Sequence, residues 1–557
     1  MVNRGRSTGC NTCKARKVKC DAGKPSCKVC YLAKRQCLGY DSAPRAKVRF
    51  KYVQPVDKEA RIEGDRQAIS TPRRMKAAVP SILPFDESAW GFFVSHYLLA
   101  EQDWTSTNGF FEILPFAIYV EHPDSALSVV VAAVAASIYN IWRGDSRLPE
   151  HLFRAALRRL QEAIQDPYES KLEATALASM VLQFHDSVRI LLGERGRLDR
   201  THHNGTIALL QHQVQGQKIS NKDPGYRSYL MQYIVHSEVN RAIRQETPMP
   251  ETVQHWLATH DLNNKFGPTF KLDLVGLLVH KLQERSSKLF DGDPKHPEYQ
   301  DQILDLRKEA MQVDVRMQEW AANDVPPEWM PTRIPVVREA EPPIQTYLGG
   351  CQIFSHTLVA SLWRLSSCYR LITLGIILQT SEILTTTTVD QRYCDQLISV
   401  SIQVIFDDIC ETLPFLMGNR TKPRASTDIK DPNITFPSYH DLVVGSSASA
   451  QHIKMRKAMS RDRYNRHLIA HGTWHALSGL SHVLALCHQM RDGPLVTKAR
   501  PGQLLWMYEQ ALRAAKILRV DALRFVEPFE STRQKGSIEC HPAEGEASFR
   551  RTNWLNI

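Results

Sequence analysis

The sequence lacks a long, strongly apolar segment. Its first ten residues, MVNRGRSTGC, are polar and predict no secretory signal. The longest apolar run, Ser125 to Trp142, only just reaches the length of a membrane span, and it contains Asn140 and several Ala and Ser residues. We expect it to form a buried core helix and expect no membrane partner. The chain is therefore predicted to occupy a soluble, reducing compartment, where clustered cysteines are more often metal ligands than disulfides.

Acidic residues are scarce at one end of the chain. Residues 1–51 contain 14 of the 70 lysines and arginines, but only two of the 59 acids, Asp21 and Asp41. The rest of the chain is almost neutral, so the formal net charge of +11 belongs to the N-terminal segment. This asymmetry favours a polyanionic partner for that segment.

Signatures of enzymes are also missing. The sequence has no phosphate-binding loop, dinucleotide fingerprint or nucleophile elbow. His467, His471 and His475 have the spacing of one helix face, which a metal site would need. However, no acid takes the place of the glutamate of zinc peptidases, and Gly472 weakens the helix. We interpret these histidines as a packed or solvated helix face and predict no enzymatic activity.

Half of the twelve cysteines, by contrast, lie in the first 37 residues. The pattern C-x2-C-x6-C occurs twice there, and its members are Cys10, Cys13, Cys20, Cys27, Cys30 and Cys37. Two such copies strongly predict a zinc site, with a disulfide framework as the weaker alternative. Two tetrahedral zinc ions need about eight coordination positions, and six cysteines without a nearby histidine supply too few. All coordination positions are filled if Cys10 and Cys27, the equivalent residues of the two copies, each bridge both ions.

This stretch resembles the fungal zinc binuclear cluster, the six-cysteine DNA-binding domain of fungal transcription factors. The resemblance covers all six cysteines, the basic run Lys14–Lys19, the Cys20–Asp21 pair and the segment Lys24–Cys27. In that family the first and fourth cysteines bridge the two zinc ions, in agreement with the ligand count. We expect a small zinc-organised module with two short helices, one after Cys13 and one after Cys30.

The basic residues of this module predict double-stranded DNA as the partner. Phosphate contacts provide affinity, and side chains in the major groove read guanine. The resemblance implies that the end of the first helix reads a CGG-type triplet, with Lys17 and Arg16 as base-reading candidates. The expected phosphate contacts are Lys14, Lys19, Lys24 and Lys34. A second basic cluster, Pro44 to Tyr52, is interpreted as an arm along the DNA, part of a nuclear import signal or a solvated linker.

Composition divides the chain into four parts. A zinc module is predicted over residues 1–41 and a flexible basic linker over residues 42–84, which are too poor in apolar residues for a coiled coil. Residues 85–526 show helical periodicity and few strand patterns, which predicts a large all-α regulatory domain. Residues 527–557 are predicted to be a disordered tail.

The helical body has several distinctive segments. Pro149–Gln165 is expected to form a helix that buries Ile164 among other apolar residues. The body loosely resembles the helical regulatory domain of the same fungal regulators, which implies homodimer formation or effector binding. Trp554 and Leu555 are candidates for a coactivator contact. The other cysteines are expected to be buried small hydrophobes: Cys351, Cys368, Cys394, Cys410, Cys487 and Cys540.

The sequence therefore predicts a nuclear, zinc-dependent, sequence-specific DNA-binding regulator of RNA polymerase II transcription. The resemblance alone suggests control of a single pathway, such as one of secondary metabolism. Two alternatives stay open. One is an enzyme or interaction scaffold with an accessory zinc domain, and the other is a regulator that acts by protein contacts while its DNA binding is vestigial.

Overall fold

The chain forms two compact units, Met1–Ala77 and Ala78–Ile557. The computed structural model describes residues 10, 12–13, 16, 18–23, 27–33, 35, 37, 87–98, 113–143, 149–191, 200–214, 227–259, 267–335, 340–384, 389–442, 457, 459–489 and 495–521. The predicted linker, residues 42–84, and tail, residues 527–557, lie outside these described residues, as does Cys540. Over the described ranges, no helix has the length and apolar character needed to cross a membrane.

The N-terminal unit contains a short helix, α2 (Lys28–Leu32), and a helical turn at Thr12 and Cys13. The Cys27 thiol caps α2 by accepting a hydrogen bond from the Cys30 backbone N–H. The helix predicted after Cys30 therefore begins earlier than expected, because this cap places its start directly after Cys27. Most of the helix predicted after Cys13 lies outside the described residues.

The first part of the body packs around α5 (Ala126–Trp142). Ser125 caps α5 by accepting a hydrogen bond from the Ser128 N–H at 3.2 Å, and most α5 side chains are buried. The predicted core helix over this segment is therefore confirmed. α5 packs against α3, α6 and α7, and α7 packs against α8. The elements of this part are α3 (Glu87–Tyr97), α4 (Leu114–Val120), α6 (Glu150–Gln165), the short turn η2 (Glu169–Lys171), α7 (Glu173–Leu191) and α8 (Thr201–Val214).

The prediction for the face of α6 needs one correction. Ile164, predicted to face the core, is 45% exposed, and Ala163 beside it is buried. Ala156 and Leu160 complete the buried face, so its members recur at intervals of four and three residues. Ile164 is the next large apolar residue after Leu160, and it lies just outside this narrow buried face.

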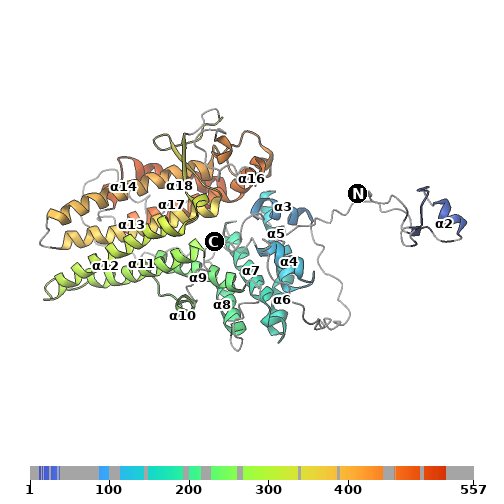
Figure 1. The fold of residues 1–557 in the computed structure, drawn as a ribbon, viewed down its shortest axis with the longest axis horizontal. Helices are drawn as coiled ribbons and strands as arrows, with labels where there is room; N and C mark the ends of the chain where they lie inside the picture. The colour runs from blue at the N-terminus through green and yellow to red at the C-terminus, as the bar shows by residue number, and fades with distance from the viewer. Residues whose placement is uncertain are drawn as a thin grey trace, which may run out of the picture. The chain divides into compact units, whose positions relative to one another are not determined.

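Long helices run side by side in the second part of the body (Figure 1). α11 packs against α9 and α12, and α13 packs between α12 and α14. A two-stranded antiparallel sheet pairs Thr332 with Ile353, and its second strand lies on α14. The elements are α9 (Arg227–Gln245), α10 (Glu251–Thr259), α11 (Pro268–Phe290), α12 (Tyr299–Glu319), η3 (Trp320–Asp324), η4 (Pro327–Trp329), β1 (Thr332–Pro335), β2 (Gly350–Ile353), α13 (Thr357–Ile383) and α14 (Val389–Met417).

The last helices close the bundle. α16 (Arg461–His467) passes through a π-helical turn, η7 (Leu468–Gly472), into α17 (Thr473–Gln489). Gly472 lies directly against the backbone of Leu416 on α14, where a larger residue would clash. α17 packs against α13 and against α18 (Gln503–Leu518). The remaining short turns are η5 (Ser426–Lys430), η6 (Tyr439–Asp441) and η8 (Val496–Lys498).

One continuous hydrophobic core extends from Ala89 to Leu518. The predicted large all-α body is confirmed, because the described body residues are mainly helical and share this core. Four of the scattered cysteines are buried in the body as predicted, but Cys394 is only half-buried. The four buried residues are Cys351, Cys368, Cys410 and Cys487.

Candidate metal centre and nucleic-acid interface

The cysteines of the N-terminal unit converge on one cluster. Cys10, Cys13, Cys27 and Cys30 are fully buried, whereas Cys20 and Cys37 are half-buried. Between the two copies of the pattern, the Sγ–Sγ distances of this buried group are Cys10–Cys27 3.6 Å, Cys10–Cys30 3.7 Å, Cys13–Cys27 3.7 Å and Cys13–Cys30 3.8 Å. The two copies of the sequence pattern thus contribute to a single compact group of thiols.

Each copy presents its first cysteine in the same way. The Cys13 N–H donates a hydrogen bond to Cys10 Sγ at 3.3 Å, and the Cys30 N–H donates one to Cys27 Sγ at 3.3 Å. The C-x2-C spacing produces this contact because a helical turn begins after the first cysteine of each pair. Such donors stabilise a thiolate and orient it as a metal ligand. The repeated spacing therefore produces a repeated local structure.

The thiols fit a pair of metal ions. Two sets of four have all their Sγ atoms within 4.8 Å of one another. A Zn–S bond of about 2.3 Å implies Sγ–Sγ distances of about 3.8 Å around a tetrahedral ion, close to the distances of 3.6 and 3.7 Å between thiols of the same set. The two sets are Cys10, Cys13, Cys20 and Cys27, and Cys10, Cys27, Cys30 and Cys37.

Burial makes the bare thiols poor anions. It raises the pKa of the Cys13 thiol to about 12 and also raises the pKa of Cys27. Metal ligation nevertheless requires thiolates, so the charge of bound cations must offset the cost of removing these groups from water. We therefore expect folding of the N-terminal unit to be coupled to metal binding.

Asp21 connects the two halves of the module. Its carboxylate accepts hydrogen bonds from the backbone N–H groups of Lys28, at 3.1 Å, and Val29, at 3.3 Å, in the first turn of α2. The hydrogen bond from Lys28, followed by that from Val29, lowers the pKa of the Asp21 carboxyl despite partial desolvation. The sequence alone showed Asp21 only as one of two acids in the basic segment and as the neighbour of Cys20. An isolated acid in a basic segment was the signal for this capping role.

Two of the predicted DNA contacts, Arg16 and Lys19, lie within the described residues, and both are exposed. Lys28 and Arg35 are exposed as well, although neither is among the predicted DNA contacts. Their positive charge within the basic segment was the feature of the sequence that could have identified them. The described part of the N-terminal unit therefore presents four accessible basic side chains. The other predicted contacts lie outside the described residues: Lys14, Lys17, Lys24 and Lys34.

The three evenly spaced histidines, His467, His471 and His475, are packed against neighbouring helices. His467 Nε2 lies 2.8 Å from Thr357 Oγ1, and His475 Nδ1 lies 2.7 Å from Ser361 Oγ, both on α13. The ring centroids of His467 and His471 are 4.6 Å apart. In the part of the chain that the structure describes, the groups spaced for a metal ion all belong to the cysteine cluster. The histidines thus form a packed helix face.

Comparison with known proteins agrees with the cysteine geometry. Residues 8–47 match the model of the fungal Zn(2)-Cys(6) binuclear cluster domain, which confirms the resemblance of this segment. That domain binds two zinc ions, so two zinc ions are the cofactor of the module.

Two curated relatives share a short segment with the chain. An uncharacterized transcriptional regulatory protein of Schizosaccharomyces pombe is 51% identical over 43 residues, which cover 8% of this chain and 8% of that protein. White-opaque regulator 2 of Candida albicans is 48% identical over 40 residues, which cover 7% of this chain and 9% of that protein. The chain thus spans under a tenth of the length of either relative. No solved structure matches the chain.

Proposed function

We propose that this chain is a zinc-dependent, sequence-specific regulator of transcription that binds double-stranded DNA in the nucleus. The observation that carries the proposal is the pair of overlapping four-thiol sets within a strongly basic segment that matches a DNA-binding domain family. One relative is named as a transcriptional regulatory protein and the other as a regulator, which supports the same assignment.

The proposed zinc assignment uses the six cysteines unequally. Cys10 and Cys27 bridge the two ions, and both belong to each set of four neighbouring thiols. The other four cysteines each bind one ion, with Cys13 and Cys20 on the first and Cys30 and Cys37 on the second. Six thiolates then supply the eight positions of two tetrahedral ions. The bound ions take the place of a hydrophobic core that so short a segment lacks.

The proposed DNA contacts divide into two classes. Arg16 and Lys17 read a CGG-type triplet through the O6 and N7 acceptors of guanine in the major groove. Lys14, Lys19, Lys24 and Lys34 bind phosphates and position the module. The exposure of Arg16 and Lys19 supports this role, because neither side chain is covered by the described part of the N-terminal unit.

The helical body is proposed to be regulatory and not enzymatic. It would form a homodimer, bind an effector or contact a coactivator, as the loose family resemblance implies. Control of one pathway, such as one of secondary metabolism, belongs to the proposal on that resemblance alone.

The test is selection of duplexes from a random library by the full-length chain, followed by titration of the recovered site. We expect CGG triplets to be enriched. We also expect binding to weaken with salt at a slope of about −4 for four phosphate contacts, and chelation of zinc to abolish binding.

A matched control separates DNA recognition from general basicity. Cys20→Ser retains the charge of the module but removes a zinc ligand, so it should lose sequence preference. Enrichment of no sequence, or equal preference in the chelated chain, would overturn the proposed function. Enrichment of a site without CGG would retain the regulator and overturn the triplet assignment.

A further inference from the structure

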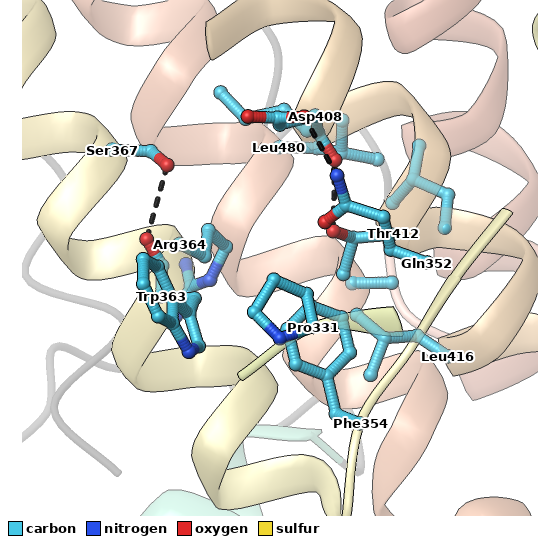
Figure 2. A pocket seen from close by; sticks show the side chains of 13 residues that line it. Pro331, Gln352, Phe354, Trp363, Arg364, Ser367, Asp408, Thr412, Leu416 and Leu480 are labelled. Atoms are coloured by element: carbon cyan, nitrogen blue, oxygen red, sulfur yellow. Dashed lines mark hydrogen bonds between the residues drawn. The ribbon is translucent and has the colours of Figure 1, made fainter. Parts of the chain in front are cut away.

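A pocket opens in the body between α13, α14, α17 and the strand β2. Its cavity volume is about 80 Å³, counted as space for the centres of water-sized molecules, and it opens to solvent on one side. Its apolar wall includes Phe354, Trp363 and Leu480. Figure 2 shows Arg364 on one side of the pocket with other α13 residues, and Asp408 of α14 on the other. The pocket is therefore mainly apolar, with oppositely charged side chains on its walls.

Arg364 lacks the carboxylate partner that two buried arginines of the body have. Arg307 and Arg420 are buried, and each forms an ion pair with a carboxylate, Asp395 at 2.7 Å and Asp428 at 3.0 Å. In the described residues, no carboxylate forms an ion pair with Arg364. Its Nε is buried without a hydrogen-bond partner, and its Nη2 donates one long hydrogen bond of 3.4 Å to Ser361 Oγ. Arg364 as a whole is half-buried, so its guanidinium can still take an acceptor from the pocket that it lines.

The groups around Arg364 also favour an anion beside its guanidinium. Burial lowers the pKa of Arg364, as expected for a cation that lacks a compensating anion. Among the residues that the structure describes, the titratable groups that interact with its charge are Arg244, Cys368, His475 and His482, none of which is a carboxylate. This corner of the pocket is consequently electropositive and attracts an anion.

The fold holds Arg364 in place from the opposite helix. Gly479 of α17 has no side chain where the Arg364 side chain crosses it, and a Cβ atom there would come within 2.8 Å of both Nε and Nη1. The guanidinium is therefore seated against the backbone of α17, next to the pocket-lining Leu480. A seated guanidinium loses little conformational freedom on binding a planar anion.

The far wall limits the charge of the ligand. The Asp408 carboxylate accepts hydrogen bonds from Arg333 and Gln352, at 2.7 Å and 2.6 Å, and it would repel a multiply charged anion. Asp408 and the Thr412 hydroxyl oxygen can accept a hydrogen bond from a ligand at this wall. The chemistry thus fits one negative charge at Arg364, an apolar body, and a hydroxyl or amino donor opposite.

We propose that this pocket binds a small organic monocarboxylate with an apolar body, whose carboxylate pairs with Arg364. The inference goes beyond DNA recognition. If the chain is a transcription regulator, the ligand is the effector through which the body responds to a metabolite. The binding site itself is independent of the zinc module.

The test is isothermal titration calorimetry on the full-length chain with hydroxyphenylpropanoate as the probe and hydroxyphenylpropanamide as its neutral counterpart. We expect the acid to bind and the amide to bind about tenfold more weakly or not at all, because it cannot make a charge-assisted pair with Arg364. The assay contains no DNA, so its failure and failure of the proposed function are distinguishable.

Three variants make the assignment specific. Arg364→Gln should weaken acid binding about tenfold, and Ser367→Leu should also weaken it by filling part of the pocket. Arg370→Gln is the matched control, because Arg370 lies on the same helix but pairs with Asp314 at 2.8 Å and does not line the pocket. It should retain the affinity for the acid.

Three outcomes would overturn the proposal: equal affinity for acid and amide, unchanged acid affinity in Arg364→Gln, or no heat of binding with the acid at about 10 mM. If Arg364→Gln does not fold, the comparison of acid with amide on the unaltered chain still decides.

Discussion

The Sγ atoms of Cys10 and Cys27 lie 3.6 Å apart although 17 positions separate them in the sequence. Both residues are fully buried, and both belong to the two sets of thiols that can hold a metal ion. No other cysteine is shared between these sets. The cluster therefore has a centre formed by one residue from each copy of the repeated pattern.

This arrangement predicts unequal effects of cysteine substitution. Cys10→Ala or Cys27→Ala should remove a ligand of both zinc ions and leave the full-length chain with almost no zinc. Cys37→Ala, at the edge of the cluster, should leave about one ion bound. The measurement is zinc content by mass spectrometry after mild chelation. Equal loss in all three variants would rule out the bridging role.

Lys17 is predicted to read bases, whereas Lys19 is predicted to bind a phosphate. Lys17→Ala should weaken binding to a CGG-containing duplex by about 1–3 kcal/mol more than binding to a scrambled duplex. Lys19→Ala should weaken both complexes similarly and reduce the salt slope by about one. Competition titrations of the two variants on the two duplexes give the comparison. A uniform effect of Lys17→Ala would make Lys17 a phosphate contact.

Gly479 and Gly205 offer a matched pair of helix glycines. Gly479→Ala should destabilise the body by about 1–3 kcal/mol, because its Cβ would displace the Arg364 side chain. Gly205 has only an ordinary contact of 3.5 Å, to Ser179 Oγ. Gly205→Ala should therefore stabilise α8 by about 0.5–1 kcal/mol. Urea unfolding measures both changes, and unchanged stability of Gly479→Ala would contradict the role of Gly479 in seating Arg364.

His471 should make the body sensitive to mild acid. Burial lowers the pKa of His471 to about 4, so the folded chain holds this ring neutral while the unfolded chain begins to protonate it near the ordinary value of 6.5. The stabilisation is present above pH 6.5 and is lost as the pH falls toward 4, by up to about 3 kcal/mol.

His471→Phe keeps a ring beside Tyr97, whose centroid is 4.8 Å from that of His471, and cannot be protonated. When the pH falls from 8 to 4.5, the free energy of unfolding should decrease less for the variant than for the unaltered chain. Urea unfolding at both pH values tests this. The same loss in both chains would assign the acid sensitivity to other groups.

Local spacing made the zinc module predictable. The C-x2-C pairs form the same thiol–N–H contacts in both copies because the contact spans only three residues. The helical body was predictable for a similar reason, since periodicity over a single helix identifies an apolar face. Even there, Ile164 of α6 is exposed, because the neighbouring helices decide how wide the buried stripe is.

The sequence by itself determined the number and spacing of the thiols, the basic charge around them and the helical character of the body, since each depends on residues close together in the chain. Only the tertiary structure decided that Asp21 caps α2, and that Arg364, Asp408 and Gly479 meet around one pocket. These residues come from separate elements, and their proximity follows from how helices and strands pack. Whether an arginine has a carboxylate partner depends on the packing of the helices, so the sequence could not identify Arg364.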